Sequence, residues 1–207
     1  MANQKSFFIT FEGGEGAGKS TQAQILDEYI KATGQQTLLI REPGNTYVGE
    51  KIRKIIREND EAIDPMTELF LFSAARKELI EKVIKPALDK NIVVICDRYI
   101  DSTIAYQHFG REIELQTVQS IIKLTTQNLI PDLTILLDIN YKEMIKRKTS
   151  GLDYFEREVE KFHNKIQNGY NELAKQEPKR WKVFDANLQK ETISKKIIRV
   201  IEQLELI

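Results

Sequence analysis

The segment that decides the fold reads FFITFEGGEGAGKST and spans residues 7–21. Its first five residues are apolar or β-branched and predict a strand, and the helical pattern from Gln22 to Thr33, ended by Gly34, predicts the helix that follows. Residues 13–20 match G-x-x-x-x-G-K-[ST], the phosphate-binding pattern that requires this strand–loop–helix context. A plain glycine-rich turn before a helix is the alternative, and the context favours a phosphate site.

The chemistry expected of this loop is specific. Glycines allow torsions that turn successive N–H groups inward, and the N-terminus of the following helix adds partial positive charge. Lys19 would place a cation on the β- and γ-phosphates, and the Ser20 hydroxyl suits Mg²⁺. The predicted cradle for a nucleoside triphosphate consists of Gly13, Gly14, Glu15, Gly16, Ala17, Gly18, Lys19, Ser20 and Thr21.

Apolar runs and helical stripes alternate along the rest of the chain. Strands are predicted at residues 37–40, 92–96 and 133–137, and a fifth ends at Val183 and Phe184. Helices are predicted around residues 48–56, from Pro65 to about Leu88, and over residues 193–204. Strands that are apolar throughout belong in a parallel sheet covered by helices on both faces. The sequence therefore predicts a single α/β domain over residues 1–207, with three layers and about five parallel strands.

The composition limits the classes of function. The chain has 207 residues, with 31 Lys and Arg against 31 Asp and Glu, so its formal net charge is zero. This balance disfavours a basic surface for nucleic acid or an anionic membrane, and no apolar run approaches the roughly 18 residues of a membrane span. Cys96 is the sole cysteine, which excludes an internal disulfide, and the N-terminus lacks a secretory apolar region. We therefore expect a cytoplasmic protein.

Motifs that are absent from this sequence exclude some classes of phosphate-loop protein. A GTPase would need an Asp-x-x-Gly switch and an Asn/Thr-Lys-x-Asp segment, and neither occurs in this chain. A large motor or helicase would need more residues. A small phosphotransferase and a non-catalytic binding module are the classes that remain.

Asp97-Arg98-Tyr99 directly follows the strand predicted at residues 92–96. An acid at the carboxyl end of a buried parallel strand points into the ligand crevice of an open sheet. Asp97 can hold Mg²⁺ through water, while Arg98 offers a forked donor to a phosphate. A helix cap or surface turn is the plain alternative for Asp97, and Asp138 is a rival acid that no arginine follows.

Phe72 and Arg76 lie four residues apart on the helix predicted from Pro65, and therefore on one face. Both fall on its apolar stripe, so a core phenylalanine beside an arginine that extends to solvent is the plain alternative. The functional interpretation is a base-binding pair, in which Phe72 stacks on a ring and Arg76 donates to its carbonyl edge.

Four further segments carry a family resemblance. They are Arg41-Glu42-Pro43-Gly44, Asp97-Arg98-Tyr99, STIAYQ at residues 102–107, and Pro131-Asp132-Leu133 with Leu137-Asp138. In this order around the phosphate loop, and over essentially the whole chain, they resemble bacterial thymidylate kinases. The resemblance implies a P-loop kinase fold with a short lid at about residues 148–156, transfer of the γ-phosphoryl group of MgATP to dTMP, and a homodimer.

The resemblance also implies a role for each matching residue. Phe72 stacks on thymine, Arg76 donates to the thymine O4, Thr103 reaches the N3 edge, Gln107 the sugar or base, and Tyr106 crowds the sugar 2′ position. The implied substrate-binding set is Glu15, Arg41, Pro43, Phe72, Arg76, Arg98, Thr103, Tyr106, Gln107, Asp153 and Phe155. The implied catalytic set is Lys19, Asp97, Arg98 and Arg147, with Arg147 also near the ATP. The metal ligands are Ser20, Asp97 through water, and Glu15 as a further candidate.

The lid departs from the family pattern. Bacterial members whose phosphate loop lacks an arginine usually carry one after Leu-Asp in the lid, where this chain has Tyr154. Arg147, Lys148 or Arg157 would supply the charge instead, and we hypothesise that it is Arg147.

Two alternatives to a dTMP kinase remain open at the level of sequence. One is a kinase for another nucleoside monophosphate or for a deoxynucleoside. The other is a non-catalytic, ATP-binding regulatory module, because a fold does not fix a function. The intact Lys19, Ser20, Asp97 and Arg98 argue against a decayed site.

Overall fold

A parallel β-sheet organises the computed structural model, which describes residues 6–59, 61–147, 154–155 and 158–204. Within these ranges the sheet has five strands in the order β2-β3-β1-β4-β5, and every neighbouring pair is parallel. The strands are β1 (Phe8–Glu12), β2 (Thr37–Arg41), β3 (Val93–Asp97), β4 (Leu133–Asp138) and β5 (Trp181–Asp185). The predicted α/β architecture and strand number are confirmed.

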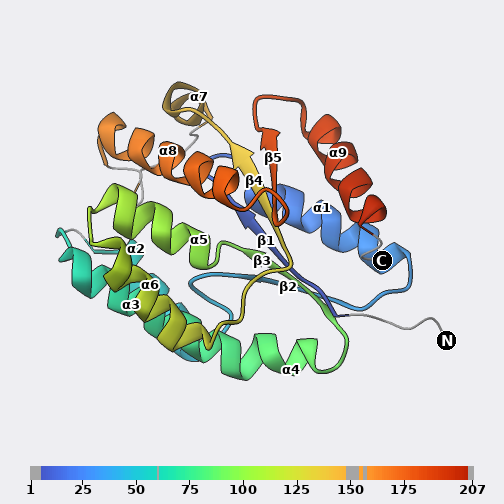
Figure 1. Cartoon of the computed structure of the whole chain (residues 1–207), viewed down its shortest axis with the longest axis horizontal. Coiled ribbons are helices and arrows are strands. Elements are labelled where there is room, and N and C mark those ends of the chain that lie inside the picture. Colours follow the sequence, from blue (N-terminus) through green and yellow to red (C-terminus); the bar gives the residue numbers. More distant parts are fainter. Residues whose placement is uncertain (1–5, 60, 148–153, 156–157, 205–207) are drawn as a thin grey trace.

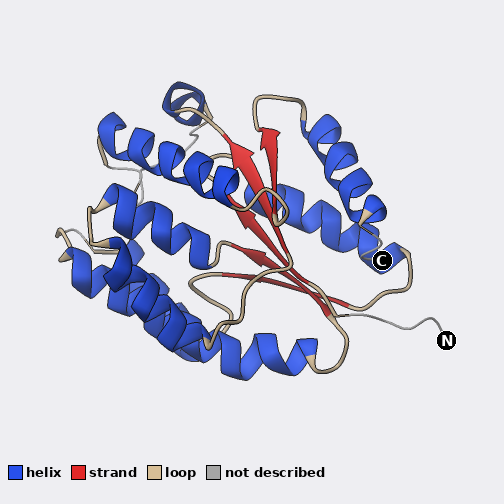
Figure 2. Ribbon diagram, in the orientation of Figure 1, coloured by secondary structure: helices blue, strands red, loops and turns tan. Residues whose placement is uncertain are grey.

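Helices cover both faces of the sheet (Figures 1 and 2). They are α1 (Lys19–Ala32), α2 (Tyr47–Arg57), α3 (Pro65–Leu79), α4 (Lys85–Leu88), α5 (Ile100–Thr103), α6 (Leu115–Thr126), α7 (Tyr141–Lys146), α8 (Glu160–Gln176) and α9 (Lys190–Gln203), with π-helical turns η1 (Ile80–Ile84) and η2 (Ile104–Gly110). The helix predicted from Pro65 to about Leu88 is the continuous run α3-η1-α4. No helix in the described ranges is long and apolar enough to cross a membrane.

The central strand β1 is buried on both faces, as its unbroken apolar run predicts. Ile9 and Phe11 belong to the core cluster that includes α1 and α9, whereas Phe8 belongs to the cluster formed with α3, η1 and α6. Figure 1 shows the same division, with α1 and α9 on one side of the strands and α3 to α6 on the other. Because β1 also pairs with both β3 and β4, the loop that leaves its carboxyl end is held from both sides.

The phosphate loop leaves β1 in a conformation that only glycine accepts easily. Gly13 has φ 137° and Gly18, which precedes the first residue of α1, has φ 91°. A Cβ at Gly13 would lie 2.4 Å from the backbone oxygen of Leu137 at the end of β4. The helix begins at Lys19, three residues earlier than the pattern from Gln22 predicts, because Gly18 ends the loop just before it.

The close approach at Gly13 predicts a strong effect of a single methyl group. We expect Gly13→Ala to lower the free energy of unfolding by more than about 2 kcal/mol, since strain at a positive φ and a backbone clash act together. Gly34→Ala is the matched control, because its φ is 89° but a Cβ there meets no atom within 4 Å. It should lose only about 1 kcal/mol. Urea denaturation of both variants measures the difference, and equal losses would contradict the clash at Leu137.

Candidate active site

The loop after β1 and the end of β3 form one wall of a cavity, here called the loop cavity. Lys19 is 6% exposed and its Nζ donates to the backbone oxygen of Gly14 at 2.7 Å. Burial, followed by the nearby Arg98 charge, lowers the pKa of Lys19 below its usual value. The predicted site residues at this cavity are Glu15, Gly16, Gly18, Lys19, Ser20, Thr21, Arg41, Asp97 and Arg98.

Ser20 and Asp97 meet in the loop cavity although 77 residues separate them. The Ser20 hydroxyl donates directly to the Asp97 carboxylate, which brings two hard oxygen ligands to the same point. In the described part of the chain no group of three or more His, Cys, Asp or Glu side chains could hold a metal ion. Two side-chain oxygens at one point fit an ion that takes its other ligands from phosphate and water, as Mg²⁺ does. The rival Asp138 accepts instead from Gln167 of α8 at 2.8 Å.

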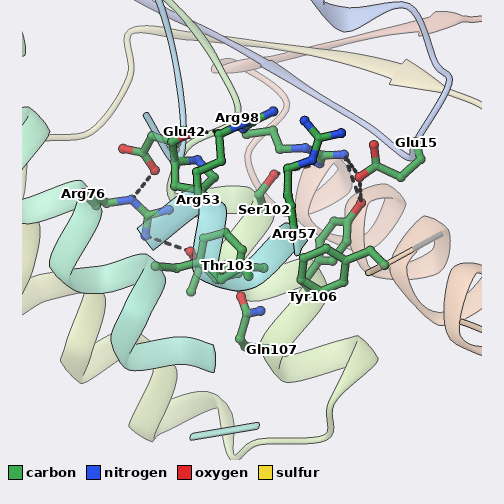
Figure 3. Close-up of a pocket in the computed structure, with 14 residues that line it drawn as sticks. Glu15, Glu42, Arg53, Arg57, Arg76, Arg98, Ser102, Thr103, Tyr106 and Gln107 are labelled. Atoms are coloured by element: carbon green, nitrogen blue, oxygen red, sulfur yellow. Dashed lines mark hydrogen bonds and ion pairs between the residues drawn. The ribbon is translucent and has the colours of Figure 1, made fainter. Parts of the chain in front are cut away.

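A second cavity, here called the helix cavity, shares Glu15, Arg53 and Arg98 with the loop cavity, and Figure 3 shows its lining residues. Its predicted site residues come from α3, from the α5-η2 segment and from the loops after β1, β2 and β3, with one from the 154–155 segment. They are Glu15, Pro43, Phe72, Arg76, Arg98, Thr103, Tyr106, Gln107 and Phe155. The rings of Phe72 and Tyr106 lie 6.0 and 5.1 Å from that of Phe155. This aromatic group gives the helix cavity an apolar part beside its charged residues.

Arg98 stands where the two cavities meet. One terminal nitrogen, Nη1, donates to the Gly13 carbonyl oxygen at 3.0 Å and to the Ser102 and Tyr170 hydroxyls at 3.2 Å each. The other, Nη2, donates to Glu15 Oε1 at 2.5 Å and to the Tyr106 hydroxyl at 3.0 Å (Figure 3). The guanidinium is thus fixed in position and borders both spaces.

Glu15 owes its ionisation state to these neighbours. Burial alone would raise its pKa, but the charges of Arg98 and Lys19 and the Tyr106 hydroxyl outweigh burial and lower the pKa to about 2. Glu15 is therefore a carboxylate throughout the physiological range, directed at the junction of the two cavities.

Arg76 is held in the wall of the helix cavity, so it does not extend to solvent. It is 2% exposed, and its Nε donates to Glu42 Oε2 at 2.7 Å. Its Nη1 donates to the Thr103 hydroxyl at 2.7 Å and its Nη2 to the Tyr99 carbonyl oxygen at 3.1 Å. A guanidinium has five N–H groups, so two remain for a ligand.

Basic residues border both cavities, and two of them were not among the predicted site residues. Arg41 is half-exposed, pairs with Glu50 at 3.3 Å, and borders the loop cavity without lining the helix cavity. Arg53 of α2 lines both cavities and Arg57 lines the helix cavity, and no sequence motif indicated either residue. Their four-residue spacing beside the buried Ile52 and Ile56 is the signal that could have indicated them.

Arg147 lies on the other side of the phosphate loop. Its Nη1 donates to the Gly16 carbonyl oxygen at 3.3 Å and its Nη2 to that of Ala186 at 2.6 Å. Together with Ala17, Thr21 and Leu188 it lines a third cavity. Of the lid predicted at about residues 148–156, Lys148 and Asp153 lie outside the described residues, as does the flanking Arg157. Tyr154 is 8% exposed, and its hydroxyl accepts from the Ile63 amide at 3.2 Å.

Comparison with known proteins identifies relatives over nearly the whole chain. The family model described as thymidylate kinase matches residues 11–197. The sequence is 46% identical to the thymidylate kinase of Dehalococcoides mccartyi, covering 96% of this chain and 97% of that protein. It is 39% identical to the thymidylate kinase of Caldanaerobacter subterraneus, covering 95% of each. The crystal structure of thymidylate kinase from Ehrlichia chaffeensis superposes with a TM-score of 0.78 at 32% identity, covering 95% of this chain and 99% of that one.

The Arg76–Glu42 pair predicts a large effect on stability when its charge balance is broken. Glu42→Gln keeps the size of the side chain but leaves the buried guanidinium without its counter-charge, so we expect the free energy of unfolding to fall by about 3 kcal/mol. Glu50→Gln is the matched control, because the Arg41–Glu50 pair is about half exposed on both sides, and should lose less than about 1 kcal/mol. Urea denaturation tests both, and a loss at Glu42 no larger than at Glu50 would refute the expectation.

Proposed function

The chain belongs to the thymidylate kinase family and transfers the γ-phosphoryl group of ATP to dTMP, giving dTDP and ADP for dTTP synthesis, and we propose that its two main cavities divide this reaction. The loop cavity holds the phosphates of ATP, and the helix cavity holds dTMP. The observation that carries this assignment is Arg98, whose guanidinium borders both cavities at the point where the two sets of phosphates would meet.

On the donor side, residues 13–21 bind the phosphates of ATP. Backbone N–H groups at the start of α1 and the Lys19 ammonium face the negative charge. Arg147 and the third cavity lie beside Gly16, on the side away from the helix cavity, which suits the adenosine part of ATP. We also assign to Arg147 the charge that the family usually carries in the lid, because it is within hydrogen-bond reach of the loop.

The metal that accompanies ATP is Mg²⁺, with Ser20 as its ligand and Asp97 acting through water. When bound, the ion neutralises phosphate charge, which is its usual part in phosphoryl transfer. Glu15 was a further candidate ligand, but its carboxylate pairs with Arg98 and accepts from Tyr106. We therefore assign Glu15 to the dTMP sugar.

On the acceptor side, the walls of the helix cavity match the parts of dTMP. Phe72 stacks on thymine, and the two remaining N–H groups of Arg76 face the thymine O4. Cytosine presents an amino group at that position and would leave the buried cation unpaired, which is a strong basis for rejection. Thr103 and Gln107 face the base edge, and Tyr106 with Pro43 and Phe155 encloses the sugar.

The acceptor phosphate lies among Arg98, Arg53 and, from the loop cavity, Arg41. Its attacking oxygen is already ionised at neutral pH, so the reaction needs no strong general base. Catalysis instead brings two anions together and compensates the charge that moves between them. Lys19 and Arg98 supply fixed positive charge for this purpose.

We further propose a homodimer in the cytoplasm. Phe70 on α3 is 55% exposed and Leu124 on α6 is 77% exposed, and the two helices are neighbours, which is consistent with an apolar contact between copies. Cys96 is buried and free, as suits a reducing compartment.

The assignment of the helix cavity predicts a base-stacking role for Phe72. The acceptors to compare are dTMP, dUMP, dCMP, AMP, GMP and thymidine. Release of ADP from MgATP should be fastest with dTMP. Phe72→Ala should raise the KM for dTMP about tenfold or more, the range expected for loss of base–aromatic stacking, and leave the KM for ATP unchanged. Tyr47→Ala, which removes an exposed aromatic ring on α2 that lines neither cavity, is the control and should change neither value.

Two outcomes would count against this function. A lack of turnover with every acceptor would contradict the enzymatic activity. A preference for a base other than thymine, or an unchanged KM for dTMP in Phe72→Ala, would contradict the placement of the base in the helix cavity.

The low pKa of Glu15 predicts the pH profile. Because its pKa is depressed to about 2, its pairing with Arg98 stabilises the fold at every pH above about 4.5 and is lost only as the pH falls towards 2. The fall of kcat/KM for dTMP in acid should therefore follow protonation of the acceptor phosphate, with a midpoint near pH 6, about that of a phosphate monoester. Glu15→Gln should lower the plateau but keep the midpoint. A midpoint shifted by one unit or more, in profiles from pH 5 to 8, would show that Glu15 itself titrates.

A further inference from the structure

A fully buried carboxylate lies directly behind the base end of the helix cavity. Glu68, in the first turns of α3, has 0% exposure and does not line the cavity itself. Its Oε1 accepts from Gln107 Nε2 of η2 at 2.8 Å. The guanidinium of Arg111 donates to Oε1 at 3.3 Å through Nε and to Oε2 at 3.1 Å through Nη2. None of the roles assigned above uses Glu68 or Arg111.

The contact with Glu68 fixes which way the Gln107 amide faces. An ionised carboxylate only accepts hydrogen bonds, so Gln107 must turn its NH₂ group towards Glu68. Its carbonyl oxygen is then left for the cavity that Gln107 lines. Figure 3 shows this oxygen turned towards the side of the cavity where Thr103 lies. Without an acceptor-only partner, either orientation of the amide would be available.

Arg111 keeps the charge of Glu68 compensated in this buried position. Its side chain is 14% exposed, lies over the Phe162 ring at 4.5 Å, and also pairs with Glu158. A buried carboxylate without such a partner would be strongly unfavourable. The pair therefore fixes the orientation of the Glu68 carboxylate at the back of the cavity.

The remaining polar groups at this end of the cavity are complementary to Gln107. Arg76 can only donate, and Thr103 already accepts one of its N–H groups. Thymine presents an acceptor, O4, beside a donor, N3–H, whereas cytosine presents the reverse pair. An oriented Gln107 oxygen next to Arg76 matches thymine and opposes cytosine.

We propose that Glu68 is a positioning residue for base specificity, because it orients the Gln107 amide so that an acceptor faces N3 of the substrate base. This inference rests on the assignment of the helix cavity to dTMP. Glu68 touches no substrate and acts only through Gln107, with Arg111 as its counter-ion.

Exchanging the carboxylate of Glu68 and the amide of Gln107 between the two positions tests the proposal. In Glu68→Gln the new amide can donate to residue 107, so the Gln107 amide is free to turn and present NH₂ to the base. The ratio of kcat/KM for dTMP over dCMP should fall about tenfold, as expected when one buried hydrogen bond is mismatched. In the double variant Glu68→Gln/Gln107→Glu, residue 107 again accepts on both sides, and most of the ratio should return.

The control acceptor is dUMP, which has the same O4 and N3–H as dTMP and lacks only the methyl group. A general loosening of the cavity would change the dTMP:dUMP ratio, whereas turning the Gln107 amide should leave it unchanged. Gln107→Met provides a second variant that leaves Glu68 in place. It should reduce the dTMP:dCMP ratio as Glu68→Gln does, even where the latter unfolds.

The outcomes separate this inference from the function on which it rests. Wild-type enzyme that fails to prefer dTMP over dCMP would contradict the base site as a whole. Two other results would overturn the role of Glu68 alone. One is a preference for dTMP that persists in Gln107→Met. The other is a preference that falls in Glu68→Gln and is not recovered in the double variant.

Discussion

The pairing of arginines that have little exposure with neighbouring carboxylates is the constraint on which the site depends. Arg98 pairs with Glu15, Arg76 with Glu42 and Arg111 with Glu68. A nucleotide kinase needs positive charge where two phosphate groups approach, but an isolated guanidinium cannot remain inside a folded domain at low energetic cost. The carboxylates compensate the guanidinium charge in the absence of substrate, and they fix the orientation of each guanidinium group. They also reconcile a strongly cationic site with a chain whose formal charge is zero.

The paired residues come from two kinds of element around the site. Glu15 is in the loop after β1, Glu42 follows β2, and Arg98 follows β3, so the carboxyl ends of neighbouring parallel strands supply the charges. Arg76 and Glu68 come from α3, which packs on one face of that sheet, and Gln107 and Arg111 come from η2 and the residue after it. In the proposed placement of dTMP, its phosphate would lie against the strand ends. Its base would lie against helices, whose side chains can be varied without altering the sheet.

The sequence predicted well what depends on local pattern, and less well what depends on packing between distant segments. The cradle at residues 13–20 and the strands needed only spacing and periodicity, and the position of Asp97 at a strand end was enough to place it near Ser20. The resemblance added the residues of the helix cavity. The sequence did not indicate Arg53 and Arg57 as cavity residues, because basic residues on a helix usually lie on its solvent-exposed face. Glu68 was missed because an acid in a first helical turn normally serves the helix dipole. Only the tertiary contact with η2 and Arg111 shows that it is buried.

The approach of Gly13 to the Leu137 carbonyl oxygen has a consequence for motion. With no room for even one methyl group between them, the phosphate loop cannot move closer to the end of β4. Motion of the loop in that direction is therefore blocked by backbone atoms on both sides, whatever side chains surround them. A substitution elsewhere in the loop can change its chemistry, but the path of the backbone at Gly13 is set by the neighbouring strand.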